Sequence, residues 1–167
     1  MRKKYRVGIV GFAHPHINHV AAMFAGHPRA EMVACADTEP LCPELRSVPY
    51  TREWNRKNVI RLAGIPKCYD DYRRMLEEEE LDIVAVNSEN SQHPDVAEAC
   101  ARAGVHVCVE KPMAGSLPDA QRMVRACREA GTTLMVNWPA TWLPHARKAK
   151  DLIAAGAIGK LVEINYR

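Results

Sequence analysis

The 167-residue sequence lacks the features of membrane, secreted and nucleic-acid-binding proteins. No apolar run approaches the roughly 20 residues of a transmembrane helix. The apolar run behind the basic N-terminus, residues 7–10, is too short for an export signal. The 23 basic and 20 acidic residues are interleaved, without the Lys/Arg stripe of a nucleic-acid binder. We therefore expect a cytoplasmic protein that binds neither membrane nor nucleic acid.

The sequence also lacks a Cys-x-x-Cys pair, although it has six cysteines. Four of them, Cys35, Cys100, Cys108 and Cys127, fall within apolar segments. Disulfide frameworks belong to short secreted chains, so we expect buried free thiols. The longest run of like charge is 77–80, four glutamates, which we expect to be the solvated end of a helix.

Strand-like and helix-like segments alternate along the chain. Short apolar runs bounded by turn residues alternate with segments of helical periodicity, which predicts a doubly wound parallel sheet, the Rossmann α/β class. The expected strands are 5–11, 31–36, 67–69, 81–86, 105–109 and 132–136, and the expected helices are 15–25, 52–63, 70–79, 94–103, 116–131 and 145–155. We expect Asp70 to cap the third helix and Ser116 to open the fifth.

The last segment, residues 160–166, differs because apolar and polar residues alternate in it. This alternation is typical of a strand with one wet face. We therefore expect a Rossmann domain over 1–159, and over 160–167 the first strand of a truncated antiparallel sheet domain. We also expect that strand to be frayed, to cover the domain non-natively, or to pair with another copy. Either that pairing or the missing sheet domain would give a homo-oligomer.

The turn after the first strand is where a dinucleotide pyrophosphate binds in such folds. The usual Gly-x-Gly-x-x-Gly reads here as Gly11-Phe12-Ala13-His14-Pro15-His16. Only the first glycine is kept, which predicts weakened binding. Asp37 follows the second strand, where an acid takes the ribose hydroxyls and disfavours a 2′-phosphate. The residues predict NAD rather than NADP, unless Asp37 only caps a turn.

The segment Glu110-Lys111-Pro112 ends the fifth strand. Ligands of open α/β sheets bind outside the carboxyl ends of the strands. A lysine there can exchange a proton with a substrate hydroxyl, which makes Lys111 the catalytic candidate. A surface lysine before a turn is the alternative.

Three histidines, His14, His16 and His19, cluster after the first strand. His16 and His19 have a spacing that metal ligands use on a helix, but no cysteine or carboxylate stands beside them in the sequence. We therefore predict no metal site, and leave open whether they line a pocket or the surface.

The segments GIVGFAHPHINH, ACAD, NSENSQHPDVAEACARAGVHVCVEKPMA and LIAAGAIGKLVEI resemble the Gfo/Idh/MocA family of oxidoreductases. The resemblance covers nearly the whole chain. It implies an NAD(P)-binding Rossmann domain followed by an open sheet domain that contacts a small-molecule substrate. It further implies roles for residues at the nicotinamide side of the crevice: Lys111 in catalysis, Glu110 by the ribose, Asn87 and Ser88 lining the crevice with His93 opening the helix behind them, and Asn137 near the nicotinamide.

The chain also departs from the family pattern. Two fingerprint glycines are replaced, an Arg often found after the last Rossmann strand is absent, and no second catalytic residue from a sheet domain is present. We expect an oxidoreductase acting on a sugar, cyclitol or similar polyol-like alcohol, with the 167 residues alone inactive. The alternatives are a non-catalytic nucleotide- or partner-binding Rossmann module and an α/β domain without a nucleotide.

Overall fold

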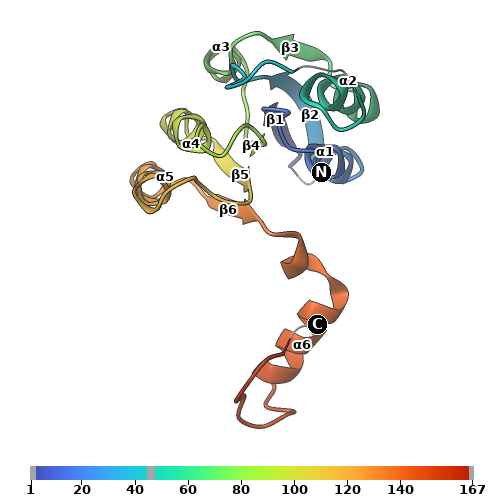
Figure 1. Ribbon diagram of the computed structural model, residues 1–167, viewed down its shortest axis with the longest axis vertical. Coiled ribbons are helices and arrows are strands. Elements are labelled where there is room, and N and C mark those ends of the chain that lie inside the picture. Colours follow the sequence, from blue (N-terminus) through green and yellow to red (C-terminus); the bar gives the residue numbers. More distant parts are fainter. Residues whose placement is uncertain (1–2, 45–47, 166–167) are drawn as a thin grey trace. The chain divides into compact units, whose positions relative to one another are not determined.

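The computed structural model describes residues 3–44 and 48–165, and the chain forms two compact units that divide after Asn137. The first unit is built on a six-stranded sheet with the order β3-β2-β1-β4-β5-β6 (Figure 1). All of its strand pairs are parallel. The strands are β1 (Tyr5–Val10), β2 (Ala30–Ala36), β3 (Lys67–Tyr69), β4 (Ile83–Val86), β5 (His106–Glu110) and β6 (Leu134–Asn137). This is the strand order of a Rossmann fold, so the predicted fold class is confirmed.

Helices cover both faces of the sheet (Figure 1). The helices α1 (Ile17–Ala25) and α2 (Arg52–Ala63) cover one face, and α3 (Tyr72–Glu78), α4 (His93–Arg102) and α5 (Leu117–Glu129) cover the other. Each face has its own apolar core: Ile17 and Val59 belong to the first, Met75 and Met123 to the second. Because both faces of the sheet are buried, its strands are near-continuous apolar runs.

The ends of two helices show how local chemistry sets the boundaries. The carboxylate of Asp71, not of Asp70 as predicted, accepts a hydrogen bond of 2.8 Å from the backbone N–H of Arg73 at the start of α3. At α5 the predicted cap is present: the Ser116 Oγ accepts from the N–H of Asp119 at 3.3 Å and donates to its carboxylate at 2.7 Å. Both caps satisfy N–H groups that the first turn of a helix leaves unpaired.

The glutamate run at 77–80 is only partly solvated. Glu79 is 7% exposed, contrary to the prediction, and its carboxylate accepts 2.6 Å hydrogen bonds from Lys67 Nζ and Tyr69 Oη. The hydrogen bond from Lys67 is the main cause that holds the pKa of Glu79 below its ordinary value. The buried thiols were predicted correctly: Cys35, Cys100, Cys108 and Cys127 are buried, and all six cysteines are free.

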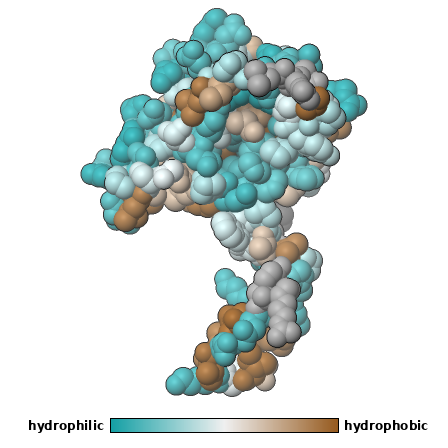
Figure 2. All heavy atoms as spheres, in the orientation of Figure 1, coloured by the Kyte–Doolittle hydropathy of each residue, from teal (hydrophilic) through white to brown (hydrophobic). Residues whose placement is uncertain are grey.

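The second unit contains a short 3₁₀ helix, η1 (Pro139–Trp142), and the helix α6 (Pro144–Ala154). The strand predicted over 160–166 is not formed by residues 160–165, and Tyr166 lies outside the described residues. A strand needs partners for its N–H and C=O groups, and no described residue pairs with this segment. Apolar residues therefore stay on the surface of this unit (Figure 2), with Val162 90% exposed and Ile164 71% exposed. The domain boundary at 159 stays a prediction.

Among the described residues, no helix combines the length and apolar character needed to cross a membrane.

Candidate functional site

The parallel sheet brings the predicted site residues to one edge. Gly11, Asp37, Asn87, Glu110 and Asn137 each end a strand or directly follow one, and in a parallel sheet these carboxyl ends share one edge. The strand order reverses direction between β1 and β4. Ligands of such sheets bind at that reversal. The topology therefore places the candidate crevice over the ends of β1 and β4.

Gly11 is required by close packing of the chain against itself. Its φ is +87°, and a Cβ there would lie 2.3 Å from the backbone nitrogen of Ser88. Two hydrogen bonds fasten the same turn: Asn87 N–H donates to Val10 O at 2.8 Å, and Ala13 N–H donates to Asn87 O at 3.0 Å. The first fingerprint glycine thus fixes the turn after β1 directly onto the loop after β4.

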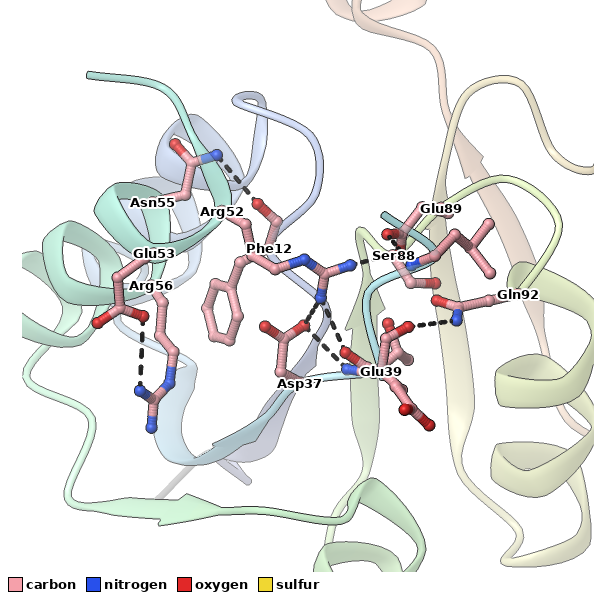
Figure 3. Close-up of polar contacts among 12 residues, drawn as sticks. Phe12, Asp37, Glu39, Arg52, Glu53, Asn55, Arg56, Ser88, Glu89 and Gln92 are labelled. Carbon is pink, nitrogen blue, oxygen red and sulfur yellow. Dashed lines mark hydrogen bonds and ion pairs between the residues drawn. The ribbon is translucent and has the colours of Figure 1, made fainter. Parts of the chain in front are cut away.

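Phe12 contributes its side chain to the core rather than to the crevice. The ring is fully buried against residues of α1 and α2. Its carbonyl oxygen accepts a hydrogen bond from Asn55 Nδ2 at 3.0 Å (Figure 3). Any contact of Phe12 with a cofactor must therefore come from its backbone. Ala13, one residue further along the turn, is half-buried.

Asp37 lies in an ion-paired cluster that the sequence did not reveal. The guanidinium of Arg52, at the start of α2, lies between the carboxylates of Asp37 and Glu89 (Figure 3). It bonds to Asp37, to Thr38 O at 2.9 Å and to Glu89 Oε2 at 2.5 Å. Burial raises the pKa of Asp37, and the hydrogen bond and charge of Arg52 oppose that rise. No local motif marks Arg52 or Glu89, because the contact joins residues 37 apart in the chain.

In the loop after β4, three buried side-chain atoms lack a partner among the described residues, and two of them belong to Asn87 and Ser88. Asn87 and Ser88 are 1% and 3% exposed. Among the described residues, Asn87 Nδ2 and Ser88 Oγ find no hydrogen-bond partner, and the same holds for Thr38 Oγ1 after β2. Buried polar atoms are nearly always paired, so exceptions call for an explanation. Asn87, Ser88 and Thr38 lie at the carboxyl ends of β2 and β4, where a ligand can satisfy them.

His93 holds this loop from behind. It is the first residue of α4, as predicted, and is fully buried. Its ring nitrogens lie 3.0 Å from Ser88 O and 3.2 Å from Met113 O. Burial lowers the pKa of His93. The ring therefore links the loop after β4 to the segment after β5, and positions Ser88 without facing the crevice itself.

Glu110 forms the centre of a polar cluster at the end of β5. Its carboxylate is 1% exposed, lies 3.1 Å from His16 Nδ1, and accepts a 3.0 Å hydrogen bond from Asn137 Nδ2. The rings of His14 and His16 pack edge to face with centroids 4.3 Å apart. Burial, followed by the charge of His16, lowers the pKa of His14. Lys111, the next residue after Glu110, is half-buried.

Comparison with known proteins agrees with this architecture. Residues 5–138 match the model of the Gfo/Idh/MocA family, described as an oxidoreductase family with an NAD-binding Rossmann fold. The chain belongs to this family.

Named relatives act on sugars and cyclitols. The chain is 31% identical over 157 residues to D-apiose dehydrogenase of Paraburkholderia graminis, which covers 94% of this chain and 38% of the relative. It is 29% identical over 116 residues to myo-inositol 2-dehydrogenase of Thermotoga maritima, covering 70% and 35%. A solved structure of the WlbA dehydrogenase of Bordetella pertussis, with NADH and UDP-GlcNAcA, matches with 29% identity and a TM-score of 0.72 over 95% of this chain and 44% of that one. The chain thus spans less than half the length of these relatives.

The described residues fit the family's cofactor, NAD. The unpartnered Asn87 Nδ2, Ser88 Oγ and Thr38 Oγ1 supply polar groups along the crevice. Two features oppose cofactor binding. Ala13 adds a methyl group where the fingerprint has glycine, and Arg52 already donates a hydrogen bond to the carboxylate of Asp37.

Proposed function

We propose that this chain is the NAD-binding domain of an oxidoreductase that acts on a sugar, cyclitol or similar polyol-like alcohol. The observation that carries the proposal is the convergence at the sheet edge: Asn87 and Ser88 offer unpartnered buried polar atoms, and Lys111 follows the neighbouring strand. The related D-apiose and myo-inositol dehydrogenases use the same kind of substrate, which supports the substrate class.

In this proposal the residues divide the work between holding the cofactor and moving a proton. The turn from Gly11 to His16 takes the pyrophosphate on its backbone, and Asp37 takes the adenosine ribose. Asn87, Ser88, Glu110 and Asn137 line the nicotinamide side. When bound there, the nicotinamide would supply hydride transfer to or from the substrate carbon, and Lys111 Nζ would exchange a proton with the substrate hydroxyl.

The charge around Asp37 favours NAD over NADP. The cluster of Asp37, Arg52 and Glu89 holds two carboxylates and one guanidinium, so its formal charge is −1. A 2′-phosphate brought beside it meets net repulsion. At an effective dielectric constant suited to a partly buried site, one unfavourable unit charge at several ångströms costs about 1–2 kcal/mol, or roughly tenfold in affinity.

Calorimetric titration of the 167-residue chain with NADH and NADPH tests the proposal. We expect NADH to bind about tenfold more tightly than NADPH. We expect no turnover of sugars by these residues alone, because Lys111 is a single catalytic residue without a second one to position the substrate hydroxyl. No heat and no thermal shift at millimolar NADH would instead support an α/β domain that binds no nucleotide. A preference for NADPH would contradict the role given to Asp37.

The variant Ser88→Ala sharpens this test. The Ser88 Oγ has no protein partner to lose among the described residues, so the free energy of unfolding should change by less than about 0.5 kcal/mol. If the hydroxyl binds the cofactor, the Kd for NADH should rise by about three- to tenfold, the effect of one hydrogen bond. The matched control is Ser91→Ala, because Ser91 is exposed in the same loop. Equal affinities for the two variants would remove Ser88 from the cofactor site.

A further inference from the structure

The structure brings a carboxylate to the histidines that the sequence leaves without one. Ligand atoms of His14, His16 and Glu110 all lie within 4.8 Å of one another. His14 and His16 come from the turn after β1, and Glu110 ends β5. The contact between His16 and Glu110 joins residues 94 apart in the chain. The prediction of no metal site depends on the absence of a carboxylate beside the histidines in the sequence. In the folded chain, Glu110 is that carboxylate.

The dimensions of this cluster suit a small coordinated ion. Zn²⁺ bonds of about 2.0–2.1 Å to nitrogen and oxygen give a ligand–ligand separation of roughly 3.3 Å in a tetrahedral site. The observed separation of His16 Nδ1 and Glu110 Oε1 is 3.1 Å, close to that edge. The widest pair of ligand atoms must close by up to about 1.5 Å from 4.8 Å to reach it. His14 lies in a turn and is half-buried, so rotation of its side chain can supply this movement.

The surroundings resemble the support that metal ligands receive in proteins. The second oxygen of Glu110 accepts a 3.0 Å hydrogen bond from Asn137 Nδ2, which fixes the orientation of the carboxylate. Glu110 is 1% exposed, whereas the side chain of His16 is 34% exposed. The cluster is thus buried on the side of the sheet and open toward solvent on the side of the turn, which gives an ion a path of entry.

We propose that His14, His16 and Glu110 bind one late first-row divalent ion, of which Zn²⁺ is the best match. Two imidazoles and one carboxylate suit Zn²⁺, Co²⁺ or Ni²⁺, whereas Mg²⁺ prefers oxygen ligands alone. Three protein ligands leave a coordination position for water. Binding also has a defined cost: the 3.2 Å contact from His16 N–H to His14 Nδ1 is lost whichever nitrogen of His14 binds, since Nδ1 then carries either the ion or a proton.

Occupancy would place a positive charge beside Lys111. This part of the inference rests on the proposed oxidoreductase function. In such an enzyme a substrate hydroxyl oxygen would take the open coordination position of the ion, and the ion would help to orient the alcohol. Metal binding itself needs no cofactor and is tested without one.

The test is calorimetric titration of chelator-treated protein with Zn²⁺ in the absence of nucleotide. Cys42 and Cys68 are exposed and are replaced by serine in the background, because thiolates also bind Zn²⁺. We expect one site with low-micromolar Kd, weakened at least about tenfold by His14→Asn and by Glu110→Gln. The matched control is His19→Asn: His19 is exposed, and its ring lies 6.5 Å from that of His16, so affinity should stay within twofold.

Co²⁺ absorption identifies the ligands independently of affinity. Nitrogen and oxygen ligation gives d–d bands alone, and thiolate ligation adds charge-transfer bands in the near ultraviolet. Charge-transfer bands, an affinity unchanged by His14→Asn, or no saturable binding would each overturn the proposal. Glu110→Gln places an amide in a buried site, so circular dichroism of each variant checks folding. If Glu110→Gln does not fold, the His14→Asn result decides the test. NADH titration uses the unsubstituted chain without Zn²⁺, because His14 and Glu110 also belong to the proposed cofactor site. Zn²⁺ binding without NADH binding, or the reverse, distinguishes failure of one proposal from failure of the other.

Discussion

Replacement of Gly11 by alanine should destabilise the domain far more than the same change at a glycine with open space around it. A φ of +87° costs a residue with a Cβ about 1–2 kcal/mol. The new methyl carbon would also lie 2.3 Å from the Ser88 nitrogen and 2.5 Å from the Ser88 Cα. To relieve this overlap the loop must move away, which breaks the bonds from Asn87 N–H to Val10 O and from Ala13 N–H to Asn87 O. Each contributes about 1 kcal/mol, so the expected loss is about 3–4 kcal/mol.

Urea unfolding followed by circular dichroism measures this loss. The matched control is Gly64→Ala, because Gly64 also has a positive φ, +61°, but nothing lies within 4 Å of its would-be Cβ. Its substitution should cost only the backbone term of about 1–2 kcal/mol. The difference between the two variants therefore isolates the close approach to Ser88. Equal losses in the free energy of unfolding would refute the packing argument, and would show that Gly11 is needed only for its positive φ.

Three further predictions concern the crevice and the sheet edge. Ala13→Gly restores a fingerprint glycine, and should lower the Kd for NADH by calorimetry; an unchanged Kd would show that the methyl does not obstruct the cofactor. Lys111→Met should change stability by less than about 1 kcal/mol while lowering kcat about 10²–10⁴-fold in the proposed enzyme; undiminished turnover would exclude Lys111. Because folding lowers the pKa of Glu79, the ionised carboxylate stabilises the folded chain above pH 4.5. This stabilisation is lost as the pH falls through the lowered pKa of the folded state. Glu79→Gln should therefore destabilise at pH 7 but not near pH 2, unlike exposed Glu77→Gln; parallel pH profiles would contradict this.

Hydrophobic periodicity was sufficient for the fold of the first unit. The helix over 94–103 and the strand over 105–109 were predicted within one residue of the bounds that the structure has, His93–Arg102 and His106–Glu110. Buried parallel strands and amphipathic helices carry their periodicity in the local sequence. Residues 160–165 form no strand. This is one of the outcomes expected for the segment 160–166, because alternation shows only that a strand would have one wet face. Whether the strand forms depends on a pairing partner, which the local pattern does not encode.

The locations of the site residues could be predicted, but their contacts could not. The order of strand ends already placed Asp37, Asn87 and Glu110 at one edge of the sheet. Asp37 and Arg52 pair across a Pro-rich stretch of sequence that has no readable period. In the same way, nothing local reveals that Glu79, within a run of four glutamates, turns inward to Lys67 and Tyr69.

The replaced glycine at the third fingerprint position shows most clearly what topology adds. From the sequence, His16 is a loss, since a ring stands where a glycine lets the helix press on the strand. In the sheet order, β4 separates β1 from β5, so a side chain that leaves the turn after β1 toward β5 must pass over the end of β4. Ser88 lies at the end of β4, and its backbone packs closely against Gly11. A side chain from the turn after β1 must therefore be long enough to pass over Ser88. His16 makes that connection to Glu110 at 3.1 Å. The same histidine that departs from the fingerprint therefore completes the cluster of His14, His16 and Glu110, and the Zn²⁺ titration decides whether this cluster binds an ion.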